Sequence, residues 1–301
     1  MKPPVYLVDA SIYVFRAWFV LPDSLTDREG NPVNAVHGFL DFVYQLLHET
    51  RDGPIGFCFD ESLETSHRRE IWPQYKANRE SAPEELKYQF RLCRRFLRAA
   101  GLPEFASNRY EADDLIGTLA RIHRARGHGI HIVTGDKDLA QLIRDGDTWW
   151  DHARSNRLDA RGIRKRFGVP PERIADQLAI AGDKSDNIPG VPGIGMTTAA
   201  RLLTRFGDLD TLLDSLHLIG SMKTRGARRI QALMSEHANT VRMSRRLTGI
   251  VETVPIDDPA LVRRPPDLEA LETLFDLLQW SPARRERWMR IASGKGLGTG
   301  D

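Results

Sequence analysis

Three short apolar runs, each leading into an aspartate, constrain the fold of this chain more than any other feature. They are residues 5–8 before Asp9, residues 55–59 before Asp60, and Ile130–Val133 before Thr134-Gly-Asp136. Between and after them lie helical patterns, with apolar side chains at steps of three and four, at residues 36–47, 115–122 and 139–143. Strands that alternate with helices favour a parallel sheet, in which functional groups gather at the carboxyl ends of the strands. We therefore expect an α/β fold with a mostly parallel sheet flanked by helices and the three aspartates at one edge.

From about Asp159 the pattern changes to short helices joined by Gly and Pro turns. We expect helices over residues 160–167, 174–181, 197–206, 209–216 and 227–236, and a last helical stretch over 268–288 that breaks near Ser281-Pro282. These patterns predict an α/β domain over residues 1–160 and an α-helical subdomain over residues 161–258. A carboxyl-terminal helical segment over 259–293 is expected to pack on the core, before a Gly-rich tail at 294–301.

The composition excludes several classes of protein. The chain has 301 residues, of which 41% are hydrophobic, and it contains no apolar run of the roughly 18 residues that a membrane span needs. Residues 1–10 lack the basic, apolar and small-residue pattern of a secretory signal. The two cysteines, Cys58 and Cys93, are too few for a disulfide framework or a four-thiolate zinc site. We expect a cytoplasmic protein with reduced, buried cysteines and no membrane partner.

Acidic residues gather in three short segments in addition to two of the strand ends. Besides Asp9 and Asp60, they are Glu111, Asp113 and Asp114, then Asp136 and Asp138, then Asp183 and Asp186. Each residue alone would suit a turn or the first turn of a helix, where acids are common. Together they predict a cluster of like charges, which needs a cation to stay ionised. Mg²⁺ suits such a loose set of carboxylates, and two ions about 4 Å apart can promote phosphodiester hydrolysis.

A glycine-rich turn before a helix predicts a binding site for phosphate. Gly190-Val-Pro-Gly-Ile-Gly195 leads into the helix expected from Thr197, whose first N–H groups would be free to bind an anion. An ordinary helix hairpin is the alternative interpretation of this motif. From Asp151 to Ile250 there are 17 Lys and Arg against 10 Asp and Glu, a surplus of 7 positive charges. A basic helical unit beside an acidic metal site is the combination that a nuclease needs.

Residues 67–79 form a basic stretch with interleaved aromatic side chains. Trp72 and Tyr75 could stack on nucleobases while the neighbouring Lys76 and Arg79 hold phosphates. Equally, the two rings could pack on the sheet, and the residues alone leave both interpretations open. The pair Trp149-Trp150 is expected to belong to a strand or to the core.

Seven motifs, taken in order, resemble those of the bacterial 5′–3′ exonuclease and flap endonuclease family, which includes the amino-terminal nuclease domain of DNA polymerase I and stand-alone relatives. The resemblance extends from Val5 to Leu278. The motifs are Leu7-Val-Asp9, Phe57-Cys-Phe-Asp60, Tyr75-Lys-Ala-Asn-Arg79, Tyr110-Glu-Ala-Asp-Asp114, Thr134-Gly-Asp-Lys-Asp138, Gly182-Asp-Lys-Ser-Asp-Asn187 and Gly190-Val-Pro-Gly-Ile-Gly195. The resemblance implies a PIN-like sheet domain with a helical arch around residues 66–98, followed by a helix–three-turn–helix subdomain that binds DNA.

The same resemblance assigns the acidic residues to two metal sites. The first would consist of Asp9, Asp60, Glu111, Asp113 and Asp114, and the second of Asp136, Asp138, Asp183 and Asp186. The ions would be Mg²⁺, with Mn²⁺ as an alternative. Lys76 and Arg79 would contact the scissile phosphate, and Arg16 would be a further phosphate contact.

The resemblance also implies where DNA and K⁺ would bind. The DNA contacts would be Tyr75 at the base of the arch and, in the helix–three-turn–helix, Gly190, Gly193, Ile194, Gly195, Thr197 and Arg201. K⁺ would bind the backbone carbonyls of Val191 and Ile194. Relatives often carry Glu-Lys after the Gly-Ile-Gly, whereas Met196 and Thr197 follow here, so backbone N–H groups and Arg201 would carry more of the duplex binding.

These observations predict a metal-dependent, structure-specific 5′ nuclease that hydrolyses DNA at 5′ ends, flaps or nicks in replication or repair, with RNA primers as further substrates. A flap-binding protein with little turnover is one alternative, and the complete set of nine acidic residues argues against it. A ribonuclease of the related fold is the other alternative, and the long basic helical half favours duplex DNA over structured RNA.

Overall fold

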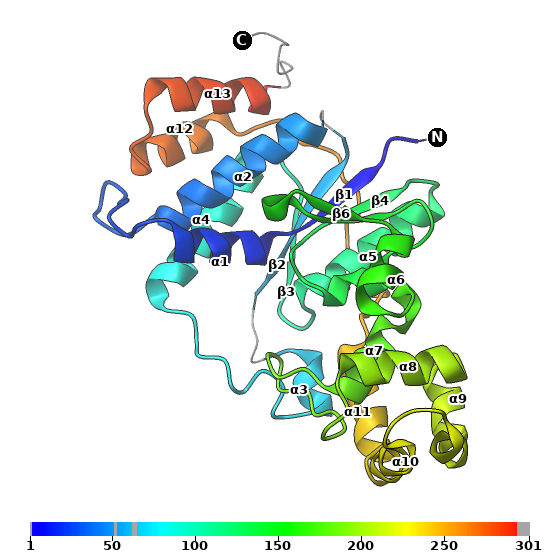
Figure 1. Ribbon diagram of the computed structural model, residues 1–301. Coiled ribbons are helices and arrows are strands. Elements are labelled where there is room, and N and C mark those ends of the chain that lie inside the picture. The colour runs from blue at the N-terminus through cyan, green and yellow to red at the C-terminus, as the bar shows by residue number, and fades with distance from the viewer. Residues whose placement is uncertain (1, 51–52, 62–64, 294–301) are drawn as a thin grey trace.

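A six-stranded sheet forms the centre of the structure, a computed structural model that describes residues 2–50, 53–61 and 65–293 (Figure 1). Its strands are β1 (Val5–Asp9), β2 (Ile55–Asp60), β3 (Glu104–Ser107), β4 (Ile130–Val133), β5 (Thr148–Asp151) and β6 (Asn156–Leu158). Their order is β3-β2-β1-β4-β5-β6, and every neighbouring pair is parallel except β5 with β6. The expected mostly parallel α/β fold is therefore confirmed.

The register of the central strands brings the strand-end aspartates to one edge. Asp9 lies opposite Cys58 in the parallel β1–β2 pair, and β2 continues along the same edge to Asp60. β4 pairs with the other side of β1, and the chain reaches Asp136 shortly after β4 ends. Because parallel strands end on the same side of a sheet, three sequence-distant acids meet there.

Helices cover both faces of the sheet and complete two apolar cores. They are α1 (Ala10–Val20), α2 (Asn34–Thr50), α4 (Glu84–Ala99), α5 (Ala112–Ala125), α12 (Leu268–Leu277) and α13 (Pro282–Ala292). Val8 and Phe57 pack with α1, α2 and α4 on one side, whereas Leu7 and Ile132 pack with α5 on the other. The final pair, α12 and α13, adds its apolar side chains to the first of these cores.

The helices of the second half share a core with the sheet. They are α6 (Ala160–Phe167), α7 (Ile174–Ala181), α8 (Met196–Phe206), α9 (Leu209–Asp214), α10 (Ala227–Glu236) and α11 (Ala238–Thr248), with the 3₁₀ helices η3 (Pro171–Arg173) and η4 (Leu216–Ser221). Leu178 of α7 and Leu202 of α8 belong to the same buried cluster as Leu119 of α5 and Ile132 of β4. Shared burial of this kind fixes the helical part against the sheet, so the two act as one scaffold.

The arch expected around residues 66–98 is in place, but it is helical only at its two ends. α3 (His67–Ile71) is short, residues 73–78 form turns, and residues 80–83 have no regular structure before α4 begins. Figure 1 shows this segment crossing from α3, beside the helical subdomain, to α4. Pro73 and Pro83 explain the break, since proline lacks the N–H that continues a helix.

Other differences from the expected elements are local. Residues 139–143 belong mainly to the 3₁₀ helix η1 (Asp138–Leu142), and α9 ends at Asp214. The helices α1 and α11 were not predicted. β3, β6 and the 3₁₀ helix η2 (His152–Arg154) were not predicted either, because none of these three segments carries an apolar run. Trp149 and Trp150 lie buried in β5, as expected. The predicted tail at 294–301 lies outside the described residues, and within the described part no helix is long and apolar enough to cross a bilayer.

Candidate active site

Four acidic side chains at the carboxyl edge of the sheet lie close enough to repel one another; we call them the central cluster. They are Asp9 at the end of β1, Asp60 at the end of β2, Asp113 in the first turn of α5, and Asp136 after β4. Burial raises the pKa of Asp9 to about 7, and the charges of Asp60 and Asp136 add to this shift. Burial also raises the pKa of Asp113, with a further contribution from the other three carboxylates. Four such groups cannot all stay ionised near neutral pH without a cation.

Hydrogen bonds fix two of these carboxylates and the backbone of a third acid. Thr134 Oγ1 donates to Asp9 Oδ2 over 2.9 Å and accepts the N–H of Asp136 over 2.9 Å. Asp60 Oδ1 accepts the N–H of Ala112 at the start of α5, also over 2.9 Å. The first N–H groups of a helix have no partner inside it, so Asp60 satisfies one of them at the positive end of α5. Burial nevertheless raises the pKa of Asp60.

A second acidic group, formed by Asp138, Asp183 and Asp186, lies beside the central cluster. Burial raises the pKa of Asp138 to about 8, and Asp136 is its strongest negative neighbour. The N–H of Asp138 donates to Asp136 Oδ1 over 2.9 Å, which links the two groups. Lys137 Nζ donates to Asp183 Oδ2 over 2.7 Å. Burial alone would raise the pKa of Asp183, but this cation and the hydrogen bonds from Ser185 together outweigh burial and lower the pKa.

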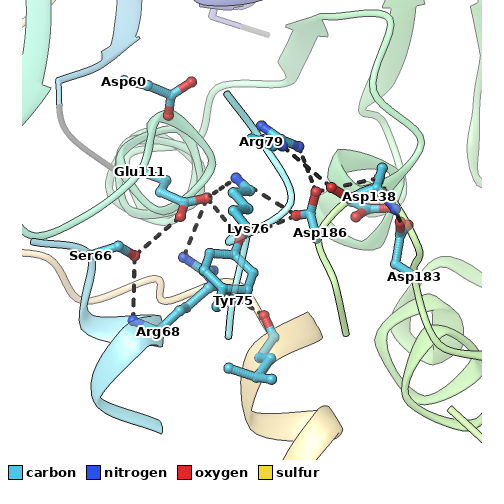
Figure 2. A network of polar contacts seen from close by, with 12 residues as sticks. Asp60, Ser66, Arg68, Tyr75, Lys76, Arg79, Glu111, Asp138, Asp183 and Asp186 are labelled. Carbon is cyan, nitrogen blue, oxygen red and sulfur yellow. Dashed lines mark hydrogen bonds and ion pairs between the residues drawn. The ribbon is translucent and has the colours of Figure 1, made fainter. Parts of the chain in front are cut away.

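Two cations at the base of the arch interleave with these acids (Figure 2). Lys76 Nζ donates to Glu111 Oε2 over 2.7 Å and lies 3.6 Å from Asp186 Oδ2. Arg79 Nη2 donates to Asp186 Oδ1 over 2.5 Å. Burial alone would raise the pKa of Glu111, but Lys76 and Arg68 outweigh it and hold the pKa at about 2. Glu111 is therefore ionised at any physiological pH and compensates the Lys76 charge.

The backbone at the base of the arch is fixed to the loop of residues 183–188. Lys76 has a left-handed φ of 53°, and its N–H donates to the carbonyl of Asp186 over 2.9 Å. Asn187, with a φ of 54°, accepts the indole N–H of Trp72 at its carbonyl over 3.0 Å. A left-handed backbone costs on the order of 1 kcal/mol outside glycine and persists where its surroundings impose it. These contacts hold Lys76 against the acidic edge.

The donor set suits a divalent metal, although it does not form a closed ligand sphere. In the parts of the chain that the structure describes, no group of three or more His, Cys, Asp or Glu side chains converges closely enough to hold one ion. The central cluster nevertheless consists of oxygen donors that raise one another's pKa, and Asp138 Oδ1 is buried without a hydrogen-bond partner among the described residues. Mg²⁺ keeps several water ligands and needs few direct protein contacts, so it fits such a set.

Asp114, which the sequence assigned to the first metal site, is occupied by other hydrogen-bond partners in the structure. Its side chain is 0% exposed, and its two oxygens accept from the guanidinium of Arg68 over 2.6 and 2.8 Å. The same oxygens accept the N–H groups of Glu111 and Val251 over 3.2 and 2.9 Å. Four donors occupy the carboxylate and leave it no free site for a metal. Asp113 and Asp114 are adjacent and have the same side chain, so the sequence does not distinguish them. In the helix α5, however, they project to different sides.

Tyr75 is also placed differently from a base-stacking ring. Its side chain is 2% exposed and packs with Ile188 and Leu247, so neither ring face is open to a nucleobase. Its hydroxyl lies 3.0 Å from Glu111 Oε2 and 3.2 Å from Asp186 Oδ2. Tyr75 is therefore a buried hydrogen-bond donor whose single O–H is shared between two acids. The alternative that it packs on the sheet is not met either.

The turn between α7 and α8 has an open side and a closed side. Gly193 has a φ of 80°, and a Cβ at Gly193 or Gly195 would meet no atom within 4 Å. A Cβ at Gly190 would overlap the backbone of Ala181 and Gly182 instead. Gly190 is therefore required for close packing, whereas the other two glycines leave the backbone open to a ligand.

The remaining predicted positions are distributed around this turn and on α1. Thr197 and Arg201 are exposed on α8, and Arg16 is exposed on α1. The side chains of Val191 and Ile194 are buried, and the carbonyl of Val191 accepts the N–H of Ile194 over 3.0 Å. The structure thus presents the α8 side chains to solvent but does not test their contacts with DNA or K⁺.

Five residues whose side chains donate hydrogen bonds to the carboxylates of the predicted acids were not singled out from the sequence: Ser66, Arg68, Thr134, Lys137 and Ser185. Thr134 and Lys137 lie inside the Thr134–Asp138 motif, so the motif could have indicated that they belong to the site. Ser66 precedes α3 and donates to Glu111 Oε1 over 3.1 Å, which only the tertiary structure reveals. Arg68 is one of several arginines in a basic stretch, and nothing local distinguishes it as buried.

Two family models cover most of the chain. Residues 4–168 match the 5′-3′ exonuclease, N-terminal resolvase-like domain, and residues 169–269 match the 5′-3′ exonuclease, C-terminal SAM fold. Together with the sheet and helical unit described above, they define a class of protein in which a resolvase-like domain precedes a SAM-like one. The chain belongs to the 5′-3′ exonuclease family.

Curated relatives extend the same match. DNA polymerase I of Pseudomonas aeruginosa is 40% identical over 282 residues, which are 93% of this chain and 31% of that protein. DNA polymerase I of Bacillus caldotenax is 36% identical over 262 residues, which are 85% of this chain and 29% of that protein. The chain thus spans about a third of the length of these relatives.

Solved structures share the fold. The T5 D15 protein co-crystallised with metal ions has a TM-score of 0.65 at 19% identity, over 96% of this chain and 99% of that chain. The catalytic core of Rad2 in complex with DNA substrate has a TM-score of 0.62 at 18% identity, over 96% of this chain and 91% of that chain. These likenesses support the arrangement of sheet, arch and helical unit.

Proposed function

We propose that this chain is a divalent-metal-dependent, structure-specific 5′ nuclease that hydrolyses phosphodiester bonds in DNA. One observation carries the proposal: Lys76 and Arg79 are held at the edge of a mutually repelling set of carboxylates by Glu111 and Asp186. Cations suited to phosphate and acids suited to a metal thereby lie in one place. Membership of the 5′-3′ exonuclease family supports the same activity.

The carboxylates would be divided between two metal positions. Asp9, Asp60, Glu111 and Asp113 would serve the first, and Asp136, Asp138, Asp183 and Asp186 the second. When bound, two Mg²⁺ ions would make hydroxide available at neutral pH and neutralise the leaving oxygen. Mn²⁺ is proposed as a substitute because it accepts the same oxygen donors. The T5 D15 protein crystallised with metal ions supports this assignment.

Lys76 and Arg79 would orient the scissile phosphate. Each is already paired with a carboxylate, so an arriving phosphate oxygen offers it a second acceptor in the same place. Lys76 is largely buried and its backbone is fixed, so its charge is preorganised for the transition state. Arg79 is 42% exposed and can follow the substrate. Arg16, exposed on α1, is proposed as a further phosphate contact.

The turn before α8 would hold the duplex away from the scissile bond. Its open backbone at Gly193 and Gly195 and the first N–H groups of α8 suit a phosphate, and exposed Thr197 and Arg201 extend that surface. The carbonyls of Val191 and Ile194 are proposed to hold K⁺, which would add positive charge at the turn. Gly190, which packs against the backbone of Ala181 and Gly182, would keep the turn in place.

The proposed substrates are DNA molecules with a 5′ end, a flap or a nick, and RNA primers annealed to DNA. The T5 D15 flap endonuclease and the Rad2 core were solved with DNA, which supports a DNA substrate here. DNA polymerase I relatives support a role in replication or repair, and we propose a cytoplasmic location on the same ground.

A labelled 5′-flap duplex tests the activity directly. The chain is expected to release the flap in Mg²⁺ or Mn²⁺ and to leave it intact in EDTA. Nicked, blunt and single-stranded DNA in parallel would define which structure is recognised. Turnover that is equal in EDTA, or absent in every divalent metal, would reject the proposal.

Asp136→Ala separates a nuclease from a flap-binding protein. It removes one carboxylate of the central cluster and is expected to abolish cleavage while flap binding persists. Asp145→Asn is the matched control, since Asp145 is exposed and lies outside both acidic groups.

Matched DNA, RNA and chimeric flaps distinguish the ribonuclease alternative, which requires faster cleavage of RNA than of DNA.

A further inference from the structure

Arg68 lies at the centre of a buried network that joins three separate parts of the chain. It belongs to α3 and is 3% exposed. Its guanidinium makes the two parallel hydrogen bonds to Asp114 of α5 described above. Its Nε donates to the carbonyl of Leu247 over 2.9 Å, and its Nη2 donates to the carbonyl of Gly249 over 3.1 Å. One side chain thus ties the base of the arch to the start of α5 and to the end of α11.

The pair of Arg68 and Asp114 is saturated with hydrogen bonds on both sides. Asp114 holds Glu111 and Val251 through their N–H groups in addition to the guanidinium. Apolar side chains of similar volume often stabilise a protein as well as a buried ion pair does. A planar guanidinium, by contrast, can fix several acceptors at defined angles. The chemistry of the pair is therefore suited to setting geometry.

The hydrogen-bond network of Arg68 and Asp114 extends to Glu111, the residue that binds Lys76. Glu111 is the N-cap of α5, and Asp114 completes its capping box by accepting the Glu111 N–H. Ser66, the N-cap of α3, donates to the other oxygen of Glu111, and Arg68 Nη1 lies 4.0 Å from Glu111 Oε2 (Figure 2). Both the backbone and the carboxylate of Glu111 are thereby fixed by groups that Arg68 and Asp114 organise.

We propose that Arg68 and Asp114 form a positioning pair that sets the place of Lys76 and Glu111 relative to the central cluster. Neither residue touches the metal or the substrate: Asp114 acts through Arg68 and through the start of α5. This proposal rests on the proposed nuclease function, because Lys76 and Glu111 are positioned for that reaction. It assigns Asp114 a role different from that of its neighbour Asp113.

The neighbouring acids provide a matched comparison. Mn²⁺ binding to the intact chain is measured by calorimetry for Asp113→Asn and Asp114→Asn, and single-turnover flap cleavage is measured at saturating DNA. Asp113→Asn removes a proposed ligand and is expected to weaken Mn²⁺ binding strongly, whereas Asp114→Asn removes none and is expected to weaken it much less. Asp114→Asn is expected to slow single-turnover cleavage at saturating DNA by about 10²-fold, as displaced catalytic groups do.

Amide exchange distinguishes positioning from a general loss of stability. In Asp114→Asn, the amides of residues 72–79 are expected to exchange faster, including the Lys76 N–H that donates to Asp186. The amides of β1 and β4 should keep their protection, because local opening leaves the core closed. Acceleration throughout the sheet would show that Asp114 only stabilises the fold.

Arg68→Lys is the second variant, which keeps the positive charge and loses the fork. It is expected to slow cleavage and loosen residues 72–79 in the same direction as Asp114→Asn, and the double variant should be no worse than the more severe single one. Mn²⁺ binding lost in Asp114→Asn as in Asp113→Asn, or wild-type cleavage rates in both variants, would overturn the proposal. If the unaltered chain cleaves no flap, the proposed function fails instead, and exchange and Mn²⁺ binding still test the placement.

Discussion

Lys76 donates a 2.7 Å hydrogen bond to Glu111, so a cation proposed to meet the substrate is bound to a carboxylate proposed to meet the metal. The same ammonium lies 3.6 Å from Asp186, which Arg79 also binds. A metal and a phosphate would therefore act on the same ion pairs. A metal that binds the acids frees the cations, and a phosphate that binds the cations frees the acids. Binding of either is expected to make binding of the other easier.

Lys76→Met should move metal binding and catalysis in opposite directions. Removing the ammonium relieves its repulsion of a metal and frees Glu111, so Mn²⁺ affinity without DNA is expected to increase. Flap cleavage is expected to fall by about 10²–10³-fold, the usual loss for one preorganised transition-state contact. Calorimetry and single-turnover kinetics measure the two effects, and Lys87→Met on the exposed face of α4 should change neither. Weaker Mn²⁺ binding in Lys76→Met would contradict this account.

The acidic edge predicts that stability without metal falls as pH rises. Asp9 and Asp138 keep their protons up to about pH 7 and about pH 8 in the folded chain, whereas both would lose them near 3.8 when unfolded. The folded state therefore binds more protons across this window, and the free energy of unfolding decreases with pH. Each group contributes up to about 1.4 kcal/mol per pH unit. Glu111, with its pKa lowered to about 2 from 4.5, has the opposite effect and only below that window.

Urea unfolding in EDTA between pH 5.5 and 8 measures this slope. Mg²⁺ should flatten or reverse it, because a metal binds the deprotonated carboxylates. Asp138→Asn should make the slope in EDTA shallower, since it removes one of the carboxylates whose raised pKa causes the slope. A stability that increases with pH in EDTA over this range would be the contrary result.

Two glycines of one turn should respond differently to alanine. Gly190→Ala introduces a methyl group that overlaps the backbone of Ala181 and Gly182, so a loss of about 3 kcal/mol in unfolding free energy is expected. Gly195→Ala meets no atom within 4 Å and has a φ of −95°, so the unfolding free energy should stay unchanged. If the turn binds phosphate, Gly195→Ala weakens duplex binding nonetheless. Thermal unfolding and duplex titration of both variants provide the comparison.

Arg201 should contribute one phosphate contact. Arg201→Ala is expected to weaken duplex binding for every sequence and to reduce the slope of log affinity against log salt by about 1. Titrations at several KCl concentrations measure this slope. Arg290→Ala on α13 is the control, because that exposed arginine pairs with Glu286 far along the chain from the turn. An unchanged slope in Arg201→Ala would remove the residue from the interface.

The strand-end aspartates could be predicted because their position depends on chain topology alone. Parallel strands that end in Asp9 and Asp60, with Asp136 just beyond a third, must bring these residues to one edge, and the structure does so. The helices between residues 174 and 206 could also be predicted from the sequence, because Gly and Pro residues mark their ends. Local patterns are informative where the local backbone decides the outcome.

Other parts of the site depend on contacts that no local pattern encodes. Asp113 and Asp114 differ only in the side of α5 that they occupy, and the second is captured by Arg68 from a distant segment. Tyr75 is buried because the arch base packs on α11, 172 positions away at Leu247. Short edge strands such as β6 form because β5 offers a partner, not because their residues favour a strand.

The aromatic packing at the end of α4 has a consequence for the mechanics of the arch. Phe96 of α4 lies 4.7 Å from Trp288 and 5.3 Å from Trp280, ring centre to ring centre, and the base of the arch is tied down at Lys76. Because both ends of the arch are held in place, only the residues between the Lys76 region and α4 are free to bend. The last two helices, although they contribute no residue to the acidic edge of the sheet, thus hold the α4 end of the arch in place.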